Sequence, residues 1–295
     1  MAILPGWEMT ETGGPAEPRD LPNEHPVVRA RVRELRSLAL RDLPSAPICL
    51  ADDFLMAFVR ARDLDCAQAF QLLRNYHRWR EECSELVGDL RPGPLLPLLA
   101  RGYHGALARP DTHGRTVLLY RVDRWDPKVH SATEVFRVSL LTSELLARDA
   151  RTQLRGVTVI FDLRGLRFGH VARVGPTMAR RIASVLTDSF PIKVRSIHLL
   201  NTPLIFKSLF AIIRPFLSEK MYSRINVHSG DAPRSLVEEV GLSVMPAELG
   251  GEGPSVEEVC AEWTRVLLGS EMELRRVTSL HHDSLCPCKL LLLND

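Results

Sequence analysis

The sequence lacks a long apolar run. Its longest stretch without Asp, Glu, Lys or Arg is residues 196–206, only 11 of 295 residues, whereas a membrane-spanning helix needs about 18 or more apolar residues. The N-terminus also lacks the basic start and apolar centre of a secretory signal. Its Gly, Pro and Glu content predicts a disordered leader over residues 1–24. We therefore expect a cytoplasmic protein that does not cross a bilayer.

Cysteine and net charge are both scarce. Six cysteines in 295 residues are too few for a disulfide scaffold, which predicts reduced thiols in an intracellular protein. A net charge of only +2 gives no whole-molecule field of the kind found in proteins that coat nucleic acids. We therefore expect no nucleic-acid partner.

Motifs for common chemistry are absent as well. The chain has no G-x-G-x-x-G, no G-x-x-x-x-G-K-[ST], no G-x-S-x-G and no H-E-x-x-H, so nucleotide binding, serine hydrolysis and zinc proteolysis all lose their usual support. Cys286 and Cys288, near His281 and His282, could hold a metal, but we interpret this end as a flexible thiol-bearing tail. The sequence predicts no enzymatic activity, no cofactor and no metal site.

Two different hydrophobic periods divide the chain. Residues 25–90 have apolar side chains at helical spacing and predict an all-helical N-terminal module, and the Pro-rich stretch 91–97 predicts a connector. Beyond it, apolar β-branched runs alternate with helical stretches, which predicts an α/β domain over 91–253 with a mostly parallel sheet. Residues 254–295 predict an acidic helix and a flexible tail. The expected strands are 116–123, 156–163, 194–201 and 224–229; the expected helices are 131–149, 171–188, 204–217 and 255–268.

Charge is segregated along the chain. Residues 173–224 contain nine basic and two acidic side chains, and the segment from 231 onward contains twelve acidic and five basic ones. The basic segment is also the most apolar, which favours contact with an anionic, lipid-like surface. Ordinary solvated helix faces would give the same counts.

The segment 204–217 has an excess of bulky apolar residues. Nine of its fourteen residues are Leu, Ile or Phe, more than one buried stripe requires. The helix is therefore either buried nearly all round, or covers an apolar cavity on one face and meets lipid on the other. In helix 131–149, Ser139 and Ser143 share a face with bulky apolar residues, which suits a ligand with one polar head. Each serine could instead bond its own helix carbonyl.

Several unbroken runs resemble one known family. They are FVRARDLD (58–65), GYHG (102–105), WDPKV (125–129), VFRVSLLTSEL (135–145), IFDL (160–163), LTDSFPIKVRSIHLLN (186–201) and RPFLSEK (214–220). These runs are similar to those of the CRAL-TRIO lipid-transfer family, in particular its α-tocopherol-transfer branch, and the match extends from about residue 50 to 265.

The resemblance implies a helical module followed by a βαβ lipid-binding domain with a closed cavity and a mobile gating helix at 204–217. It implies a hydrophobic ligand, most simply α-tocopherol (vitamin E), carried between membranes. The family's Trp in its D-L-E-G-W run is replaced here by Leu166, which leaves the ligand open. The implied cavity lining is Tyr103, Tyr120, Phe136, Ser139, Ser143, Phe161, Leu166, Ile182, Val185, Leu186, Phe190, Ile192 and Ile197, and the implied gate residues are Phe206, Phe210, Ile213 and Phe216.

The resemblance also implies a phosphoinositide contact at four basic positions, Lys193, Arg195, Lys220 and Arg224. Lys193 and Arg195 are expected to project from one strand face, and Lys220 and Arg224 from one helix face if the helix continues that far. The implied function is a carrier whose cargo is released with help from phosphatidylinositol bisphosphate during transient contact with endosomal or plasma membranes. The alternative is a phosphoinositide-sensing adaptor, or a carrier of another lipid such as a retinoid, in which the cavity lipid is regulatory.

Overall fold

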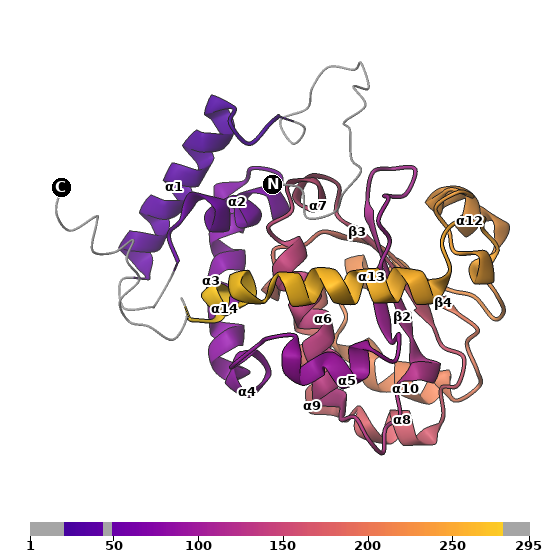
Figure 1. The fold of residues 1–295 in the computed structure, drawn as a ribbon. Helices are drawn as coiled ribbons and strands as arrows, with labels where there is room; N and C mark the ends of the chain where they lie inside the picture. Colours follow the sequence, from indigo (N-terminus) through magenta and orange to yellow (C-terminus); the bar gives the residue numbers. More distant parts are fainter. Residues whose placement is uncertain (1–20, 44–48, 280–295) are drawn as a thin grey trace.

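The computed structural model describes residues 21–43 and 49–279. Most of the expected disordered leader and the tail that contains His281, His282, Cys286 and Cys288 lie outside the described residues. Figure 1 shows a helical part on one side of the molecule and a sheet covered by helices on the other.

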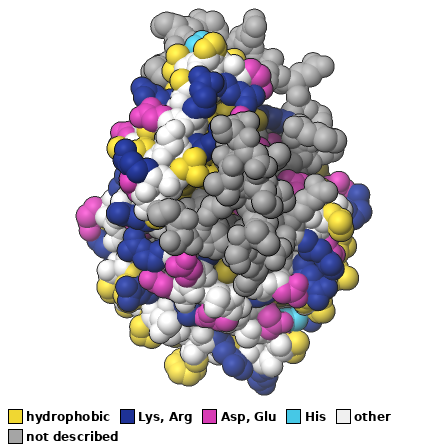
Figure 2. Space-filling view, turned by 90° about the vertical axis from the view of Figure 1, so that its left-hand side faces the viewer, with side chains coloured by type: hydrophobic (Ala, Val, Ile, Leu, Met, Phe, Trp, Pro, Cys, Tyr) yellow, Lys and Arg dark blue, Asp and Glu magenta, His cyan; other side chains and the backbone are white. Residues whose placement is uncertain are grey.

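The N-terminal part consists of helices, as the apolar spacing predicts. Asp65 caps α3 by accepting a hydrogen bond from the backbone N–H of Gln68, the expected satisfaction of a free N–H at a helix start. In the coloured part of the face shown in Figure 2, basic, acidic and hydrophobic side chains are interspersed, which is typical of a solvated surface. The helices are α1 (Pro26–Asp42), α2 (Asp52–Ala61), α3 (Cys66–Glu82) and α4 (Ser84–Val87).

Beyond a connector that contains a 3-10 turn (Gly93–Leu95) and α5 (Leu96–Leu99), the chain builds a five-stranded sheet in the order β1-β2-β3-β4-β5. The predicted α/β fold with a mostly parallel sheet is confirmed: β2 through β5 are parallel, and only β1 runs antiparallel to β2. The strand β1 was not predicted. The strands are β1 (His104–Ala106), β2 (Thr116–Arg121), β3 (Val157–Asp162), β4 (Val194–Leu200) and β5 (Ile225–Val227).

The helices between the strands begin where local chemistry dictates. Ser131 and Glu134 form the capping box that starts α6. The single helix expected over 171–188 is wrong: Gly175 and Pro176 divide it, because Pro cannot supply the N–H that a continuous helix needs. The elements are α6 (Ala132–Leu146), α7 (Ala150–Arg155), α8 (Phe168–Arg173), α9 (Pro176–Ser184) with a π-helical turn (Val185–Ser189), α10 (Phe206–Ile213) with a 3-10 turn (Arg214–Phe216), α11 (Glu219–Tyr222), α12 (Arg234–Val240), α13 (Val256–Gly269) and α14 (Glu271–Ser279).

The two faces of the sheet belong to two apolar clusters. Side chains from one face, such as Leu119 and Ile160, pack with α12 and α13; α13 crosses in front of the sheet in Figure 1. Side chains from the opposite face, such as Leu118 and Val159, belong to a larger cluster that includes α1, α2 and α3. The helical part and the sheet therefore share one continuous core.

Candidate functional site

An apolar cavity of about 250 Å³ lies on the face of the sheet that belongs to the larger core cluster. Its walls come from β2, β3, β4, α6, α9 and the π-helical turn, and α10 covers it with Leu209 and Ile213. All the side chains that the resemblance implied for a ligand cavity lie around this one space: Tyr103, Tyr120, Phe136, Ser139, Ser143, Phe161, Leu166, Ile182, Val185, Leu186, Phe190, Ile192 and Ile197.

The cavity contains few polar groups. Among the described residues that line it, none is charged, and the hydroxyl groups belong to Tyr103, Tyr120, Ser139 and Ser143. The Ser139 side chain hydrogen-bonds Tyr120, while burial raises the pKa of Tyr120 to about 12. Burial also raises the pKa of Tyr103 well above its ordinary value. Both phenols are therefore neutral hydrogen-bonding groups at physiological pH, and the lining suits an uncharged ligand with a small polar head.

A buried network holds Tyr120 in place from behind. The Phe161 and Tyr120 rings stack with centroids 4.7 Å apart, and Tyr120 stacks on His104 at 4.2 Å. His104 Nδ1 donates to the carbonyl of Leu119 at 2.9 Å, because a carbonyl can only accept. Its Nε2 must then accept from the Thr142 hydroxyl at 2.8 Å. Burial lowers the pKa of His104 to about 3, so the ring stays neutral at physiological pH.

The sequence analysis missed about half of the lining, although the strand period could have identified part of it. Side chains at i and i+2 of a strand point to the same face. Because Tyr120 lines the cavity, Leu118 and Val122 are expected in the same wall. In the same way, Phe161 indicates that Val159 and Leu163 line the cavity. The other additional side chains are Trp125, Ala132, Val135, Val157, Val174, Met178, Val194 and Leu209.

The gate segment, residues 204–217, is not buried all round. No side chain of α10 is fully buried, and Leu204 and Phe216 are 87% and 39% exposed. Phe206 and Phe210 lie 5.4 Å apart between ring centroids, each packed in part against the core. Leu209 and Ile213 of the helix thus line the cavity, while Lys207, Ser208 and Ala211 are its exposed side chains. The exposed apolar groups, Leu204 and Phe216, lie at the two ends of the gate segment. Of the two interpretations that the sequence left open, the structure favours a cavity cover.

Two further exposed apolar side chains were missed. Val129, in the connection after β2, is 64% exposed, and Phe168, at the start of α8 after β3, is 73% exposed. Leu204 follows β4. Since β2, β3 and β4 are parallel, these connections all leave the same end of the sheet. Three exposed apolar side chains, Val129, Phe168 and Leu204, therefore lie in connections at the end of the sheet where the gate segment begins.

A second depression, of about 560 Å³, gathers the four expected phosphoinositide positions. Lys193, Arg195, Lys220 and Arg224 all line it, together with Arg62, which the sequence analysis missed; we call it the basic hollow. Lys220 and Arg224 do not share a helix face, because the helix does not continue that far: α11 ends at Tyr222, and Arg224 lies beyond its C-cap, Ser223. A turn brings Arg224 to the hollow instead, in which the backbone N–H of Arg224 donates to the carbonyl of Met221 at 3.1 Å.

The basic side chains in the hollow have partners within the chain. Lys193 Nζ lies 2.6 Å from Asp63 Oδ1 and is only 8% exposed, and burial lowers its pKa. Arg224 Nη1 donates to the carbonyl of Val194 at 2.6 Å, and Arg195 Nε donates to that of Arg155 at 3.2 Å. These bonds orient the basic groups before any anion binds.

The cavity and the basic hollow share a wall. Leu186, Ile192 and Val194 line both spaces. Leu186 lies in the π-helical turn, a form that is rare and frequent at functional sites. A movement of this wall would change both spaces together.

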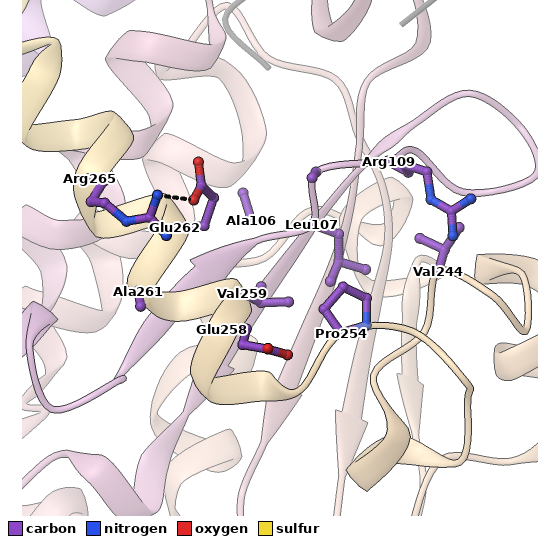
Figure 3. A pocket seen from close by; sticks show the side chains of 11 residues that line it. Ala106, Leu107, Arg109, Val244, Pro254, Glu258, Val259, Ala261, Glu262 and Arg265 are labelled. Atoms are coloured by element: carbon purple, nitrogen blue, oxygen red, sulfur yellow. Dashed lines mark ion pairs between the residues drawn. The ribbon is translucent and has the colours of Figure 1, made fainter. Parts of the chain in front are cut away.

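Another hollow, of about 400 Å³, lies beside α13 and has no lining residue in common with the cavity. Figure 3 shows Val259 of α13 near Leu107, and the ion pair between Arg265 and Glu262; the two charged groups lie 2.5 Å apart. Its other two charged side chains form hydrogen bonds within the chain, Arg109 to the carbonyl of Ser243 and Glu258 from Ser255. In the part of the chain that the structure describes, no group of three or more His, Cys, Asp or Glu side chains is placed to hold a metal ion.

Comparison with known proteins identifies the family. The model of the CRAL/TRIO domain matches residues 100–251, just over half of the chain. The chain belongs to the CRAL/TRIO family. The family expected from the sequence runs is therefore confirmed, and this CRAL/TRIO domain contains the sheet, the cavity, the gate segment and most of the basic hollow.

The chain is also similar to several named proteins. This CRAL/TRIO chain is 37% identical over 249 residues to human alpha-tocopherol transfer protein-like, which covers 84% of this chain and 72% of the relative. It is 30% identical over 255 residues to human clavesin-2, covering 85% and 77%. The crystal structure of Sfh5 aligns with 85% of this chain at a TM-score of 0.49 and 11% identity. Within the described ranges, no helix combines the length and apolar character that crossing a bilayer demands.

Proposed function

We propose that this CRAL/TRIO protein binds one hydrophobic isoprenoid lipid, α-tocopherol in the first instance, and transfers it between membranes. The observation that carries the proposal is the covered cavity whose described lining offers only hydroxyl groups to a ligand's polar head. A chain of about sixteen carbons at about 0.8 kcal/mol per buried CH₂ offers roughly 13 kcal/mol before the costs of binding. That is enough for sub-micromolar affinity.

The proposed exchange takes place at a membrane surface. When α10 closes the cavity, its partly exposed apolar side chains face water; at a bilayer they would enter the acyl region, and the cover would open. The cavity of about 250 Å³ is slightly smaller than the roughly 300–1,000 Å³ of most ligand pockets. The cavity would therefore have to widen to hold cargo, and movement of the cover would both widen it and admit the lipid. We place the protein in the cytoplasm, with transient contact to endosomal or plasma membranes.

The basic hollow would hold a phosphatidylinositol bisphosphate headgroup during that contact. Four described cationic groups converge there at the predicted positions, and Arg guanidinium groups engage phosphates by paired hydrogen bonds. Leu186, Ile192 and Val194 separate the hollow from the cavity. Headgroup binding would therefore promote cargo release by moving this shared wall. The same shared wall would serve the alternative, an adaptor that senses phosphoinositides and whose cavity lipid is regulatory.

The cargo is tested by native mass spectrometry of the purified protein followed by lipid extraction, with displacement of fluorescent tocopherol as a second measurement. We expect one lipid per chain and displacement by neutral isoprenoids. We also expect cargo to move between two vesicle populations at protein concentrations far below that of the cargo, which an adaptor would not achieve. Failure of every neutral isoprenoid to displace the probe would contradict the carrier proposal.

The headgroup contact is tested by the double variant Arg195→Ala with Arg224→Ala. Near an anionic surface each cation contributes about 1 kcal/mol, so binding to vesicles that contain phosphatidylinositol 4,5-bisphosphate should fall roughly thirtyfold. The preference over phosphatidylserine vesicles of equal charge should disappear, while tocopherol binding in solution stays unchanged. Arg234→Ala with Arg265→Ala removes the same charge from α12 and α13 and is the control. An unchanged preference in the first variant would exclude these residues from the contact.

A further inference from the structure

An acidic side chain from the helical part occupies the basic hollow. Asp63 lies in the corner between α2 and α3, and its Oδ1 is 2.6 Å from Lys193 Nζ, 130 residues away in the sequence. The Lys193 side chain is 8% exposed, whereas the Asp63 side chain is 55% exposed. An anion that approaches Lys193 from solvent therefore meets the Asp63 carboxylate first, and this carboxylate already neutralises the charge of the lysine.

The corner is built to present this carboxylate. Asp63 and Leu64 both have left-handed backbone conformations, with φ of 50° and 70°, which non-glycine residues rarely adopt and which Asp and Asn tolerate best. Backbone hydrogen bonds from Asp63 N to Arg60 O and from Leu64 N to Val59 O close the corner at 3.2 and 3.0 Å. The position of the carboxylate is therefore fixed by a tight turn at the end of α2.

An incoming anion would compete with Asp63 for Lys193. A headgroup with a single negative charge offers the lysine no more than Asp63 already does, and Asp63 repels it. A headgroup with several phosphates also reaches Arg62, Arg195, Lys220 and Arg224, which line the same hollow, and these added contacts offset the loss of the Asp63 pair. The internal carboxylate thus penalises singly charged headgroups most.

We propose that Asp63 determines headgroup specificity, by holding Lys193 until a polyphosphorylated inositol headgroup displaces it. This inference rests on the proposed function of the basic hollow. The proposal gives the helical part a role in headgroup recognition, because Arg62 and Asp63 both line the hollow from the end of α2. Displacing Asp63 also breaks a contact between the helical part and the start of β4.

Asp65 provides a matched control two residues away. It lines the same hollow, but its carboxylate caps α3, accepting from the backbone N–H and the side-chain amide of Gln68 at 2.9 Å each. Asn is as good an N-cap as Asp, and Asn also tolerates the left-handed conformation of Asp63. Asp63→Asn and Asp65→Asn therefore remove one charge each from the same hollow with little change in the backbone, and only the first releases Lys193.

The experiment measures vesicle binding of wild type, Asp63→Asn and Asp65→Asn to phosphatidylserine vesicles and to phosphatidylinositol 4,5-bisphosphate vesicles of equal charge. We expect Asp63→Asn to bind phosphatidylserine vesicles about tenfold more tightly than Asp65→Asn does, so that its preference for the bisphosphate narrows by the same factor. Calorimetry with soluble inositol 1,4,5-trisphosphate and with inorganic phosphate separates the headgroup itself from the membrane surface. In Asp63→Asn, the ratio of the affinities for these two soluble anions should fall by the same factor relative to Asp65→Asn.

Equal behaviour of the two Asn variants would overturn the role of Asp63, whatever the wild type prefers. Failure of the proposed headgroup contact would give a different result. The wild type would then show no preference for bisphosphate vesicles, and the double variant Arg195→Ala with Arg224→Ala would bind both kinds of vesicle as the wild type does. Asp63→Gly, which accepts positive φ without strain, repeats the test independently of the Asn side chain. Tocopherol binding in solution should be the same for all variants, which verifies the fold.

Discussion

Replacing Glu144 with alanine is expected to lower the free energy of unfolding by about 3–5 kcal/mol. Arg80 Nη1 on α3 lies 2.6 Å from Glu144 Oε1 on α6, and their side chains are 5% and 6% exposed. Tyr76 donates its hydroxyl to the same carboxylate oxygen at 2.9 Å. Removing Glu144 leaves a guanidinium charge buried without its partner, which costs more than the lost hydrogen bonds alone.

Urea denaturation gives the measurement. Glu262→Ala is the control, since its ion pair with Arg265 is largely exposed and pairs of that kind contribute about 1 kcal/mol or less. Glu144→Gln should fall between the two, because an amide oxygen still accepts from Tyr76 but carries no charge. If Glu144→Ala costs no more than Glu262→Ala, the buried pair does not hold α3 against α6 as described.

Introducing aspartate at Phe206 or Phe210 is expected to weaken vesicle docking by at least about a hundredfold. A buried Phe contributes about 1.5–3 kcal/mol, and a carboxylate in the acyl region costs about another 2.5–3.5 kcal/mol. Neither Phe is fully buried in the closed form, so stability in solution should fall far less. The measurement is flotation with anionic vesicles, paired with thermal unfolding of the same samples.

Leu40→Asp is the matched control for docking. Leu40 is also a partly exposed apolar residue, 43% accessible, but lies on α1. It should leave docking within a few fold of wild type. Equal losses of docking and of stability in the Phe variants would show that α10 is an ordinary core helix rather than a membrane-facing cover.

The strands β2, β3 and β4 could be predicted because they are largely buried on both faces. Runs such as those of β2 and β3 are nearly all apolar, aromatic or β-branched, and helical patterns separate the strands. The strand β1 has only His104, Gly105 and Ala106, none of which favours a strand. Gly105 is needed for another reason: a Cβ there would lie 2.9 Å from Val259 on α13. A strand formed by such close packing has no local sequence signal.

The site was predictable only as far as local patterns and family runs extend. Ser139 on α6 was identified from its helical face, and its partner Tyr120 on β2 only from the resemblance. The condition for placing Lys220 and Arg224 on one helix face is not met, because α11 ends before Arg224 and a turn brings Arg224 to the hollow. Asp63 carries no signal at all, because its meeting with Lys193 depends on how the helical part packs against the sheet. Long-range electrostatics of this kind follow from tertiary structure.

The wall formed by Leu186, Ile192 and Val194 has a thermodynamic consequence for transport. Coupling between two sites is reciprocal: if a bound headgroup lowers the affinity for cargo by some factor, cargo lowers the affinity for the headgroup by the same factor. Under the proposed function, the loaded protein therefore leaves a phosphoinositide membrane sooner than the empty one. Residence time then depends on cargo, so net flux follows the cargo gradient between membranes with no input of chemical energy.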